Sequence, residues 1–567
     1  MSRGKLIVLA ASTSESSEYQ HSASHQMLLA SLPQQYAKWL GPDWSTHVEI
    51  NPDGSAKYVP NGLRVVEALL ARCFSPEDIA VCYPDQLDRF IGDDTRVVGI
   101  HAHNPLGITF ATDVYAGLYG RTGESINAYE FRRLIEHPAI QLRRPGLKVI
   151  VGGPGAWQIE HKDLQDAWGI DCIVHGEAEE IVPPLFEAAV RGEAIPCRLE
   201  AKSPGMSSIP YRLNRSTCGV VEITRGCGRG CQFCSAALRD GKSIPLHHIL
   251  ENVRTQVAQG ADTIALTTED LFLYEQGRNL TANKRALRTL FQAVAGVPGV
   301  RHLTLTHGTM APVVVTPDLV EELRLAVDLS VGQHPASTHP DHRYATMSVG
   351  LETGSVRLFK QFMKAKSYPF RPEQWPDVVL KGMEIMNRAN WFPMCTFMLG
   401  LPGETDADMK ESLDLLYALR GAKCCVIPTL FVPLEDTRLA SAQAARIRHL
   451  SDLQWEFFFT CWRYNIDFFR REKSTQWKYN LAIPLYYYFI GRKLFGSAMK
   501  YPLLRLGHVP ERFLRRHLYL DFRHGSQRFT VPDHVEVPVR QPLPDYAPDD
   551  LRQPLRVLRA HPFGGRS

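Results

Sequence analysis

The stretch Arg225-Gly-Cys-Gly-Arg-Gly-Cys-Gln-Phe-Cys234 places three of the chain's twelve cysteines within eight residues. Three thiolates this close together can surround one soft metal centre, and the glycines let the backbone fold around it. Zinc sites normally use four ligands, and no second Cys/His pair follows at a matching spacing. A cubane [4Fe–4S] cluster held by three cysteines keeps one iron open. The spacing of Cys227, Cys231 and Cys234 therefore favours such a cluster.

The composition is that of a globular protein. The chain has 567 residues, of which 44% are hydrophobic and 22% charged, and this length suggests about three domains. Twelve cysteines are too few for a disulfide scaffold. No uncharged apolar run reaches the ~18 residues of a membrane-spanning helix. The first apolar run, Leu6–Ala11, is shorter than the ~7–15 residues of a signal-peptide core. We therefore expect a cytoplasmic protein.

Strand-like and helix-like segments alternate on both sides of the cysteines, which predicts an α/β fold. Residues 1–195 predict a doubly wound, Rossmann-like parallel sheet, and Pro196, Pro204 and Pro210 mark a linker over 196–216. Residues 217–438 predict a partial β/α barrel. The predicted strands of the first domain are Lys5–Ala11, Asp78–Tyr83, Arg96–Ala102, Lys148–Val151 and Asp171–Val174. Those of the barrel are Gly219–Thr224, Thr263–Thr267, His302–Thr306, Ala345–Leu351, Met394–Leu399 and Cys425–Phe431. In both folds, ligands bind at the carboxyl ends of the strands.

The cysteine spacing, with Phe233 before the last cysteine, resembles the radical S-adenosylmethionine (SAM) superfamily. Three later motifs strengthen this resemblance: Thr267-Thr-Glu-Asp270, Val349-Gly-Leu-Glu-Thr-Gly-Ser355 and Phe397-Met-Leu-Gly-Leu-Pro-Gly-Glu404. The resemblance implies that the open iron binds the amino and carboxylate groups of SAM. It also implies that Thr268, Glu269, Glu352, Gly400 and Gly403 line the SAM site.

Residues 1–195 resemble the cobalamin-binding domain of B12-dependent radical SAM enzymes, because two glycine-containing loops follow neighbouring strands. These loops are Val151-Gly-Gly-Pro-Gly155 and His175-Gly-Glu-Ala-Glu179. The resemblance implies that the corrinoid contacts His103, Asn104, Gly152, Gly153, His175, Gly176 and Glu177. Many cobalamin domains carry Asp-x-His-x-x-Gly after the first strand, but here Lys57 and Val59 replace the Asp and His before Gly62. That motif cannot supply a cobalt ligand, which leaves His101 or His103 as candidates.

The combined resemblance implies a [4Fe–4S] cluster, SAM and cobalamin as cofactors, and an electron donor such as flavodoxin or ferredoxin. The main hypothesis is methylation of an unactivated carbon on a small-molecule or lipid-like substrate. Relatives with the same parts also catalyse cyclisation or rearrangement, which is the alternative. A third hypothesis is a tRNA methylthiotransferase. Those relatives need three clustered N-terminal cysteines, whereas Cys73, Cys82 and Cys172 are dispersed here. We therefore expect no nucleic-acid partner.

The pattern changes again beyond residue 438. Residues 439–530 predict a helical region, and the Pro-rich residues 531–567 predict an extended tail. Within 491–530, nine Lys/Arg against two acidic residues give a net charge of +7, whereas the whole chain carries +4. Aromatic residues next to this charge suit peripheral membrane contact through 481–530. A helix packed on the barrel with a solvated basic face is the simpler interpretation.

Overall fold

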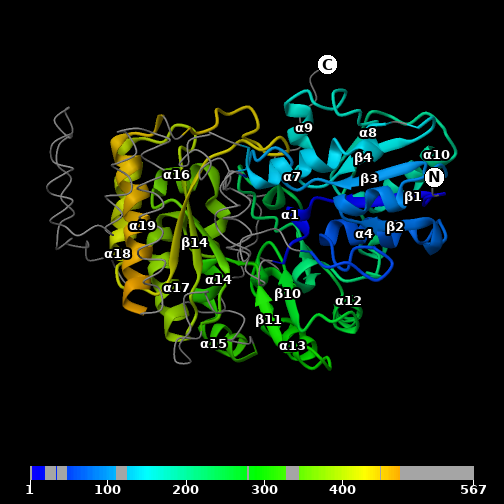
Figure 1. Ribbon diagram of the computed structural model, residues 1–567. Coiled ribbons are helices and arrows are strands. Elements are labelled where there is room, and N and C mark those ends of the chain that lie inside the picture. Colours follow the sequence, from blue (N-terminus) through cyan, green and yellow to red (C-terminus); the bar gives the residue numbers. More distant parts are fainter. Residues whose placement is uncertain are drawn as a thin grey trace, which may run out of the picture.

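The computed structural model describes residues 3–18, 34, 48–109, 124–142, 144–277, 280–326, 344–446 and 449–472. The N-terminal domain is built on a six-stranded parallel sheet in the order β2-β1-β3-β4-β5-β6 (Figure 1). Its strands are β1 (Ile7–Ala11), β2 (Ile79–Cys82), β3 (Val97–His101), β4 (Lys148–Gly152), β5 (Cys172–His175) and β6 (Arg198–Glu200). The strand order reverses between β1 and β3, which is where ligands bind in sheets of this kind.

Helices cover both faces of this sheet. Alternate residues of β1 belong to two different cores: Val8 packs with Phe131, and Leu9 packs with Leu63. Burial on both faces explains why the strands consist of continuous Val, Ile and Ala residues. The helices are α1 (Thr13–Ser16), α4 (Asn61–Leu70), α5 (Leu87–Phe90), α7 (Ile126–Ile135), α8 (Pro138–Gln141), α9 (Trp157–His161) and α10 (Val182–Val190). The predicted doubly wound sheet is thus present as a parallel α/β sheet.

The second domain is a half-barrel made of two parallel sheets, ordered β11-β10-β7 and β12-β13-β14-β15. Its strands are β7 (Val220–Glu222), β10 (Thr263–Thr267), β11 (His302–Leu305), β12 (His307–Gly308), β13 (Ser348–Glu352), β14 (Met394–Leu399) and β15 (Cys425–Leu430). The two sheets meet at Thr306, which separates β11 from β12. A short antiparallel pair, β8 (Thr224–Arg225) and β9 (Lys242–Ser243), flanks the cysteine loop.

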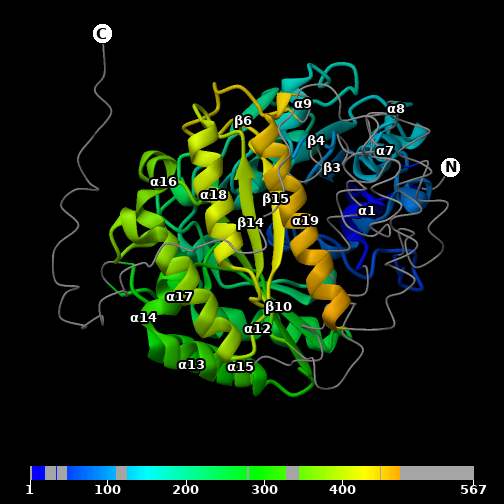
Figure 2. The ribbon, with the colours of Figure 1, turned by 90° about the vertical axis from the view of Figure 1, so that its left-hand side faces the viewer.

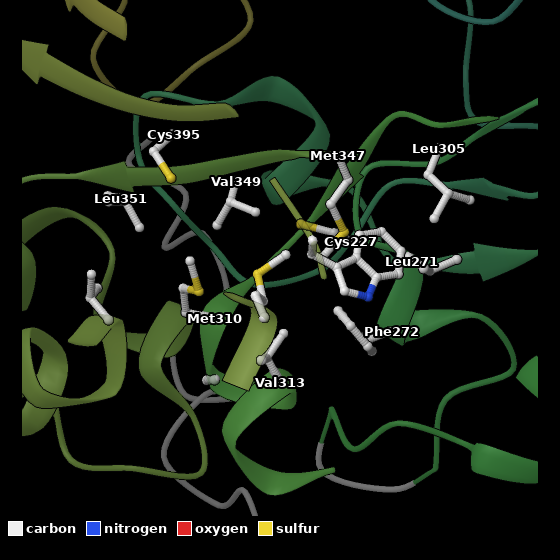
Figure 3. Close-up of a cluster of buried hydrophobic side chains, with 14 of the residues drawn as sticks. Cys227, Leu271, Phe272, Leu305, Met310, Val313, Met347, Val349, Leu351 and Cys395 are labelled. Atoms are coloured by element: carbon white, nitrogen blue, oxygen red, sulfur yellow. The ribbon is translucent and has the colours of Figure 1, made fainter. Parts of the chain in front are cut away.

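The helices of the half-barrel lie outside the strands (Figure 2). They are α12 (Leu246–Ala258), α13 (Lys284–Ala295), α14 (Met310–Val315), α15 (Pro317–Ala326), α16 (Val356–Phe362), α17 (Trp375–Arg388) and α18 (Asp406–Ala418). One further short helix, α11 (Ser235–Leu238), follows the cysteine loop. One continuous core of buried side chains fills the space between strands and helices, and Cys227 belongs to it together with Leu271 and Met347 (Figure 3).

The predicted linker 196–216 differs from the structure at its beginning, because β6 extends the first sheet at residues 198–200. This strand has only three residues, and its Arg-Leu-Glu sequence lacks the apolar character of a buried strand. The rest of the segment joins the two domains. Arg64 Nε donates to the carbonyl of Arg215 over 2.8 Å, and Arg212 Nε donates to Asn61 Oδ1 over 2.9 Å.

The described part of the C-terminal region consists mainly of α19 (Asp452–Glu472), which packs on β15 and α18 (Figure 2). Residues 473–567 lie outside the described residues. The predicted membrane-contact segment 481–530 and the predicted tail 531–567 therefore both lie outside the described residues. Among the described helices, none is both long enough and apolar enough to cross a membrane.

Candidate functional site: the cysteine loop and two facing strand ends

The cysteine loop connects β8 to α11 and is shaped by its glycines. Gly226, Gly228 and Gly230 have φ values of 68°, 66° and 72°, a left-handed conformation that favours glycine. The backbone N–H of Cys227 donates to Ala236 over 3.0 Å, and that of Gly230 donates to Ala237 over 2.8 Å. The loop that carries the three cysteines therefore folds back on α11.

The three thiols are largely withdrawn from water. Cys227 and Cys231 are 7% and 5% exposed, and Cys234 is half-buried. Burial raises the pKa of Cys227 to about 11, and it raises that of Cys231 to about 12 although the Lys366 ammonium opposes the shift. Neutral buried thiols become ligands when a metal centre displaces their protons. The residues present thus fit a group that supplies positive charge.

The arrangement also separates a cluster from a single ion. Among the described residues, no three His, Cys, Asp or Glu side chains converge as ligands of one metal ion. In a cubane, each of the three cysteines binds a different iron, so their sulfurs stand further apart. Cys234 still raises the pKa of Cys227 and of Cys231, and Cys227 raises that of Cys231. Three thiols on one loop are the donor set of a [4Fe–4S] cluster with one open iron, whereas zinc sites normally use four ligands.

A buried ion pair anchors the loop to the barrel. Arg229, between the first two cysteines, donates to Asp270 Oδ2 through Nε and Nη2 over 2.9 and 2.7 Å. The Thr309 hydroxyl donates to the same oxygen over 2.8 Å, and Arg229 Nη1 donates to the Ala365 carbonyl over 3.3 Å. Both charged side chains are at most 2% exposed. The loop is therefore fixed to the carboxyl end of β10.

The end of β10 holds Thr268 and Glu269 beside the loop. The hydroxyls of Thr268 and Thr224 are 2.6 Å apart. At the seam of the sheets, the backbone N–H of Thr268 donates to the Thr306 hydroxyl, and that hydroxyl donates to the Thr268 carbonyl. Glu269 is exposed to solvent, yet the surrounding protein raises its pKa and the positive charge of Arg239 partly offsets the shift. A carboxylate here suits an ammonium group.

Glu352 terminates β13 in a strained conformation, with a φ of 63° and a register shift against β14. Its Oε1 accepts a hydrogen bond from Lys366 Nζ over 2.7 Å, and both side chains are about a tenth exposed. Strained non-glycine residues concentrate at functional sites. The pair lies next to the cysteines, since Lys366 acts on the pKa of both Cys231 and Cys234.

His307 joins this group from the seam between β11 and β12. Burial lowers the pKa of its imidazole, and a hydrogen bond to the Thr268 backbone opposes the shift. The charges of Lys366, Asp270 and Glu352 also reach it. Its side chain nevertheless remains open to solvent. His307 thus presents a neutral ring between the ends of β10 and β13.

The predicted glycines after β14 form a turn. Gly400 and Gly403 have φ values of 78° and 73°. A Cβ on Gly400 would lie 2.4 Å from that of Ala445, whereas a Cβ on Gly403 would meet nothing within 4 Å. The N–H of Gly400 donates to Glu404 Oε2 over 2.6 Å, and Gln454 Nε2 donates to the same oxygen over 2.7 Å. Glu404 therefore ties the turn to α19.

Glu404 makes stability depend on pH. Burial raises the pKa of Glu404 to about 7 from 4.5. The contribution of Glu404 to the free energy of unfolding is therefore fully present below pH 4.5 and is lost as the pH rises through 7. We expect Glu404→Gln, which keeps an acceptor oxygen, to be more stable than the wild type at pH 8 by about 1–2 kcal/mol. At pH 5 the two should be nearly equal. Urea denaturation at both pH values measures this difference, and an equal difference at both would contradict it.

In the N-terminal sheet, His103 and Asn104 lie at the end of β3. The buried Glu15, which follows β1, accepts hydrogen bonds from the backbone N–H groups of His103 and Asn104 over 2.8 and 3.3 Å. Its other oxygen lies 2.9 Å from Nδ1 of His101. The side chain of His103 is exposed. The carboxyl ends of β1 and β3 are thus joined at the point where the strand order reverses.

Gly152 and Gly153 end β4 against β3. A Cβ on Gly153, whose φ is 113°, would lie 2.7 Å from the Ala102 carbonyl oxygen, and one on Gly155 would lie 2.1 Å from that of His103. Gly152 has room for a Cβ, since its nearest contact would be 3.5 Å away. These glycines therefore allow the backbones of two neighbouring loops to approach each other closely.

The loop after β5 holds His175, Gly176 and Glu177. His175 Nε2 lies 2.7 Å from Glu160 Oε2, which makes an ion pair when the ring is protonated. Glu177 contacts the other domain: its two oxygens accept hydrogen bonds from Arg225 over 3.1 Å and from Arg239 over 2.9 Å. The N-terminal loop thus reaches both ends of the cysteine loop.

The structure therefore brings Thr268, Glu269 and Glu352 to the cysteines and gathers His103, Asn104, Gly152 and Gly153 at one edge of the first sheet. The functional candidates that the sequence analysis missed are Arg225, Arg229, Asp270, His307 and Lys366. Arg229 lies in the cysteine motif and Asp270 ends the Thr267–Asp270 motif, but nothing in the sequence indicates that the two side chains form a pair. Lys366 and His307 carry no local signal.

Comparison with known proteins agrees with this arrangement. Residues 221–416 match the radical SAM superfamily model. A tRNA-2-methylthio-N(6)-dimethylallyladenosine synthase of Nocardia farcinica is 23% identical over 287 residues, which are 50% of this chain and 53% of the relative. An uncharacterised protein of Methanopyrus kandleri is 25% identical over 334 residues, covering 48% and 57%. The chain thus spans about half the length of the curated relatives it matches.

A solved structure shares the fold over a longer range. It is the radical S-adenosylmethionine methyltransferase TsrM from Kitasatospora setae with cobalamin and a [4Fe–4S] cluster bound. The similarity has a TM-score of 0.50 at 13% identity and covers 80% of this chain and 81% of the other. With the three cysteines and the half-barrel, the match over residues 221–416 identifies a radical SAM domain, whose cofactors are a [4Fe–4S] cluster and SAM.

Proposed function

We propose that this chain is a radical SAM methyltransferase that also binds cobalamin and methylates an unactivated carbon of a small-molecule or lipid-like substrate. The observation that carries the proposal is the contact between the two sites. Glu177, at the carboxyl end of β5, bonds to the arginines that flank the cysteine loop. The ligand-binding edge of the first sheet therefore lies against the half-barrel's cluster loop.

The fold similarity to a solved structure also supports the proposed function. The TsrM structure has cobalamin and a [4Fe–4S] cluster bound, and its likeness to the present protein covers 80% of the present chain. The six-stranded parallel sheet has its strand-order reversal between β1 and β3. A planar cofactor binds at such a position, where loops expose their backbone.

The two cofactors supply an electron for cleaving SAM and a carrier for the methyl group. The residues of the chain supply position and charge. Glu269 suits the ammonium of SAM, and the Glu352–Lys366 pair offers both signs of charge beside Cys231 and Cys234. Holding reactants in place contributes several kcal/mol to catalysis. We also expect a flavodoxin or ferredoxin as the electron donor.

Of the two histidines considered as cobalt ligands, the contacts favour His103. Nδ1 of His101 lies 2.9 Å from Oε2 of the buried Glu15, and the His101 side chain is only 10% exposed. His101 is therefore engaged and largely buried. The side chain of His103 is exposed. The protein packed around the ring lowers the pKa of its imidazole, although the charge of Glu15 opposes the shift, so the ring is neutral.

The alternative of tRNA methylthiolation is weakened by the first sheet. Cys82 is on β2 and Cys172 on β5, and three strands separate them. At about 4.8 Å per strand, the two strands are about 19 Å apart. These cysteines cannot share a second cluster. The tRNA-modifying relatives are matched over about half of their length.

Metal and corrinoid analysis tests the proposal. After anaerobic purification with cobalamin supplied, we expect about four irons and about one corrinoid per chain. The Cys227→Ala/Cys231→Ala/Cys234→Ala variant should lose the iron and keep the corrinoid, because the two sites use different domains. Iron without corrinoid in the wild type would contradict the cobalamin part of the proposal.

Product mass distinguishes methylation from the alternative reaction. Once a substrate is in hand, addition of a methyl group in place of hydrogen raises its mass by about 14 Da, whereas cyclisation or rearrangement leaves it unchanged or lowers it by about 2 Da. Mass spectrometry with deuterated methyl-SAM makes the origin of the methyl group explicit.

A further inference from the structure

Two arginines bracket the cysteine loop. Arg225 is two residues before Cys227, and Arg239 directly follows α11, on which the loop folds back. The N–H of Gly228 donates to the Arg239 carbonyl over 2.9 Å, so the backbone at Arg239 is bonded to the loop between Cys227 and Cys231. Arg225, at the end of β8, leads directly into the loop.

A single carboxylate from the other domain binds both arginines. Glu177 Oε2 accepts from Arg225 over 3.1 Å, and Glu177 Oε1 accepts from Arg239 over 2.9 Å. The side chain of Glu177 is only 12% exposed. Its partners are 48 and 62 residues away in sequence. Glu177 thus connects the N-terminal sheet to both ends of the loop.

The backbone that carries Glu177 has little freedom. The preceding Gly176 has a φ of 85°, and a Cβ there would lie 2.6 Å from the Ala201 carbonyl oxygen. Nearby, Glu179 Oε1 lies 2.6 Å from Arg225 Nη1, and the Glu179 side chain is 1% exposed. Ion pairs that are this well buried have defined geometry and are costly to break.

We propose that Glu177 is a positioning residue that holds the cysteine loop against the N-terminal sheet and offsets the charge of the arginines beside the cluster. The inference deepens the proposed function, since the same carboxylate would fix the distance between the two cofactors. The electrostatic effect of Glu177 acts on the cluster and does not require cobalamin. A test on corrinoid-free protein therefore distinguishes failure of this inference from failure of the proposed cobalamin-dependent function.

The sign of the effect follows from charge. Reduction adds an electron to the cluster, so a nearby negative charge lowers the reduction potential and a nearby positive charge raises it. Removing the Glu177 carboxylate should make the potential more positive. Removing the Arg239 guanidinium should make it more negative. A general loosening of the structure would not produce opposite shifts from two partners of one ion pair.

The experiment is an EPR-monitored redox titration of anaerobically reconstituted, corrinoid-free protein, with and without SAM. We expect a positive shift for Glu177→Gln, a negative shift for Arg239→Gln, and a potential close to wild type for Glu177→Asp, which keeps the charge. Glu200→Gln is the matched control, since Glu200 lies on the same sheet but its side chain is 71% exposed. It should leave the potential unchanged.

Two results would overturn the inference. One is a wild-type potential for both Glu177→Gln and Arg239→Gln at wild-type iron content. The other is a shift of the same sign for both variants. If Glu177→Gln does not retain iron, the Arg239→Gln variant still tests the inference, because the Arg239 side chain is half-exposed and can be replaced without disturbing the core. A reduction potential that is not lowered in Arg239→Gln contradicts the proposed charge balance.

Discussion

Asp270→Ala is expected to destabilise the protein by about 3–5 kcal/mol and to prevent cluster binding. The substitution leaves the Arg229 guanidinium buried without its counter-charge, because both of its bonds to a carboxylate go to Asp270. It also removes the acceptor of the Thr309 hydroxyl. Since Arg229 lies between Cys227 and Cys231, the cysteine loop loses its attachment to β10.

Urea denaturation of the metal-free protein measures the loss of stability, and iron analysis after anaerobic reconstitution measures cluster binding. Asp262→Ala is a suitable control, because Asp262 precedes the same strand but is exposed. Replacing both partners, as in Arg229→Met/Asp270→Ala, should recover part of the stability, since no unpaired charge stays buried. A single variant as stable as the wild type would show that the pair does not anchor the loop.

The sequence predicts the buried strands well and the short polar one poorly. β10 and β14 have the predicted bounds, because each is a largely apolar run whose buried side chains belong to the core between strands and helices. β6 lies within the predicted linker, because its pairing with β5 depends on backbone hydrogen bonds at the sheet edge and not on apolar side chains. The predicted strand Ala345–Leu351 begins later, at Ser348, because Ala345 makes only an isolated bridge to Trp391.

The site divides in a similar way. The cluster ligands are readable because three cysteines and three glycines lie within one loop. The contacts around them are not, since they join residues distant in sequence: Arg229 meets Asp270 across 41 positions, and Glu177 meets Arg239 across 62. The resemblance implies that Glu177 contacts the corrinoid. In the structure, the Glu177 carboxylate binds Arg225 and Arg239. Only the packing of the two domains reveals that role.

Gly350→Ala is expected to reduce SAM cleavage about 100-fold, the scale of loss that a displacement of about 1 Å in a catalytic group produces. A Cβ at this position would lie 1.9 Å from Glu352 Oε1 and 2.5 Å from Lys366 Nζ. Both atoms are the far ends of long side chains. The side chains can therefore move aside while the backbone stays in place, and the fold should be retained.

This separation of function from stability makes the variant informative. Iron content should equal that of the wild type, because the atoms nearest to the added methyl group belong to Glu352 and Lys366 and not to a cysteine. Formation of 5′-deoxyadenosine and the SAM-induced change in the cluster EPR spectrum should both fall. Gly205→Ala is the control, since its Cβ would meet nothing closer than 3.7 Å. If Gly350→Ala cleaves SAM at the wild-type rate, the Glu352–Lys366 pair does not contact SAM. The SAM site must then be assigned to Thr268 and Glu269 on the other side of the seam, together with the open ring of His307 beside the seam.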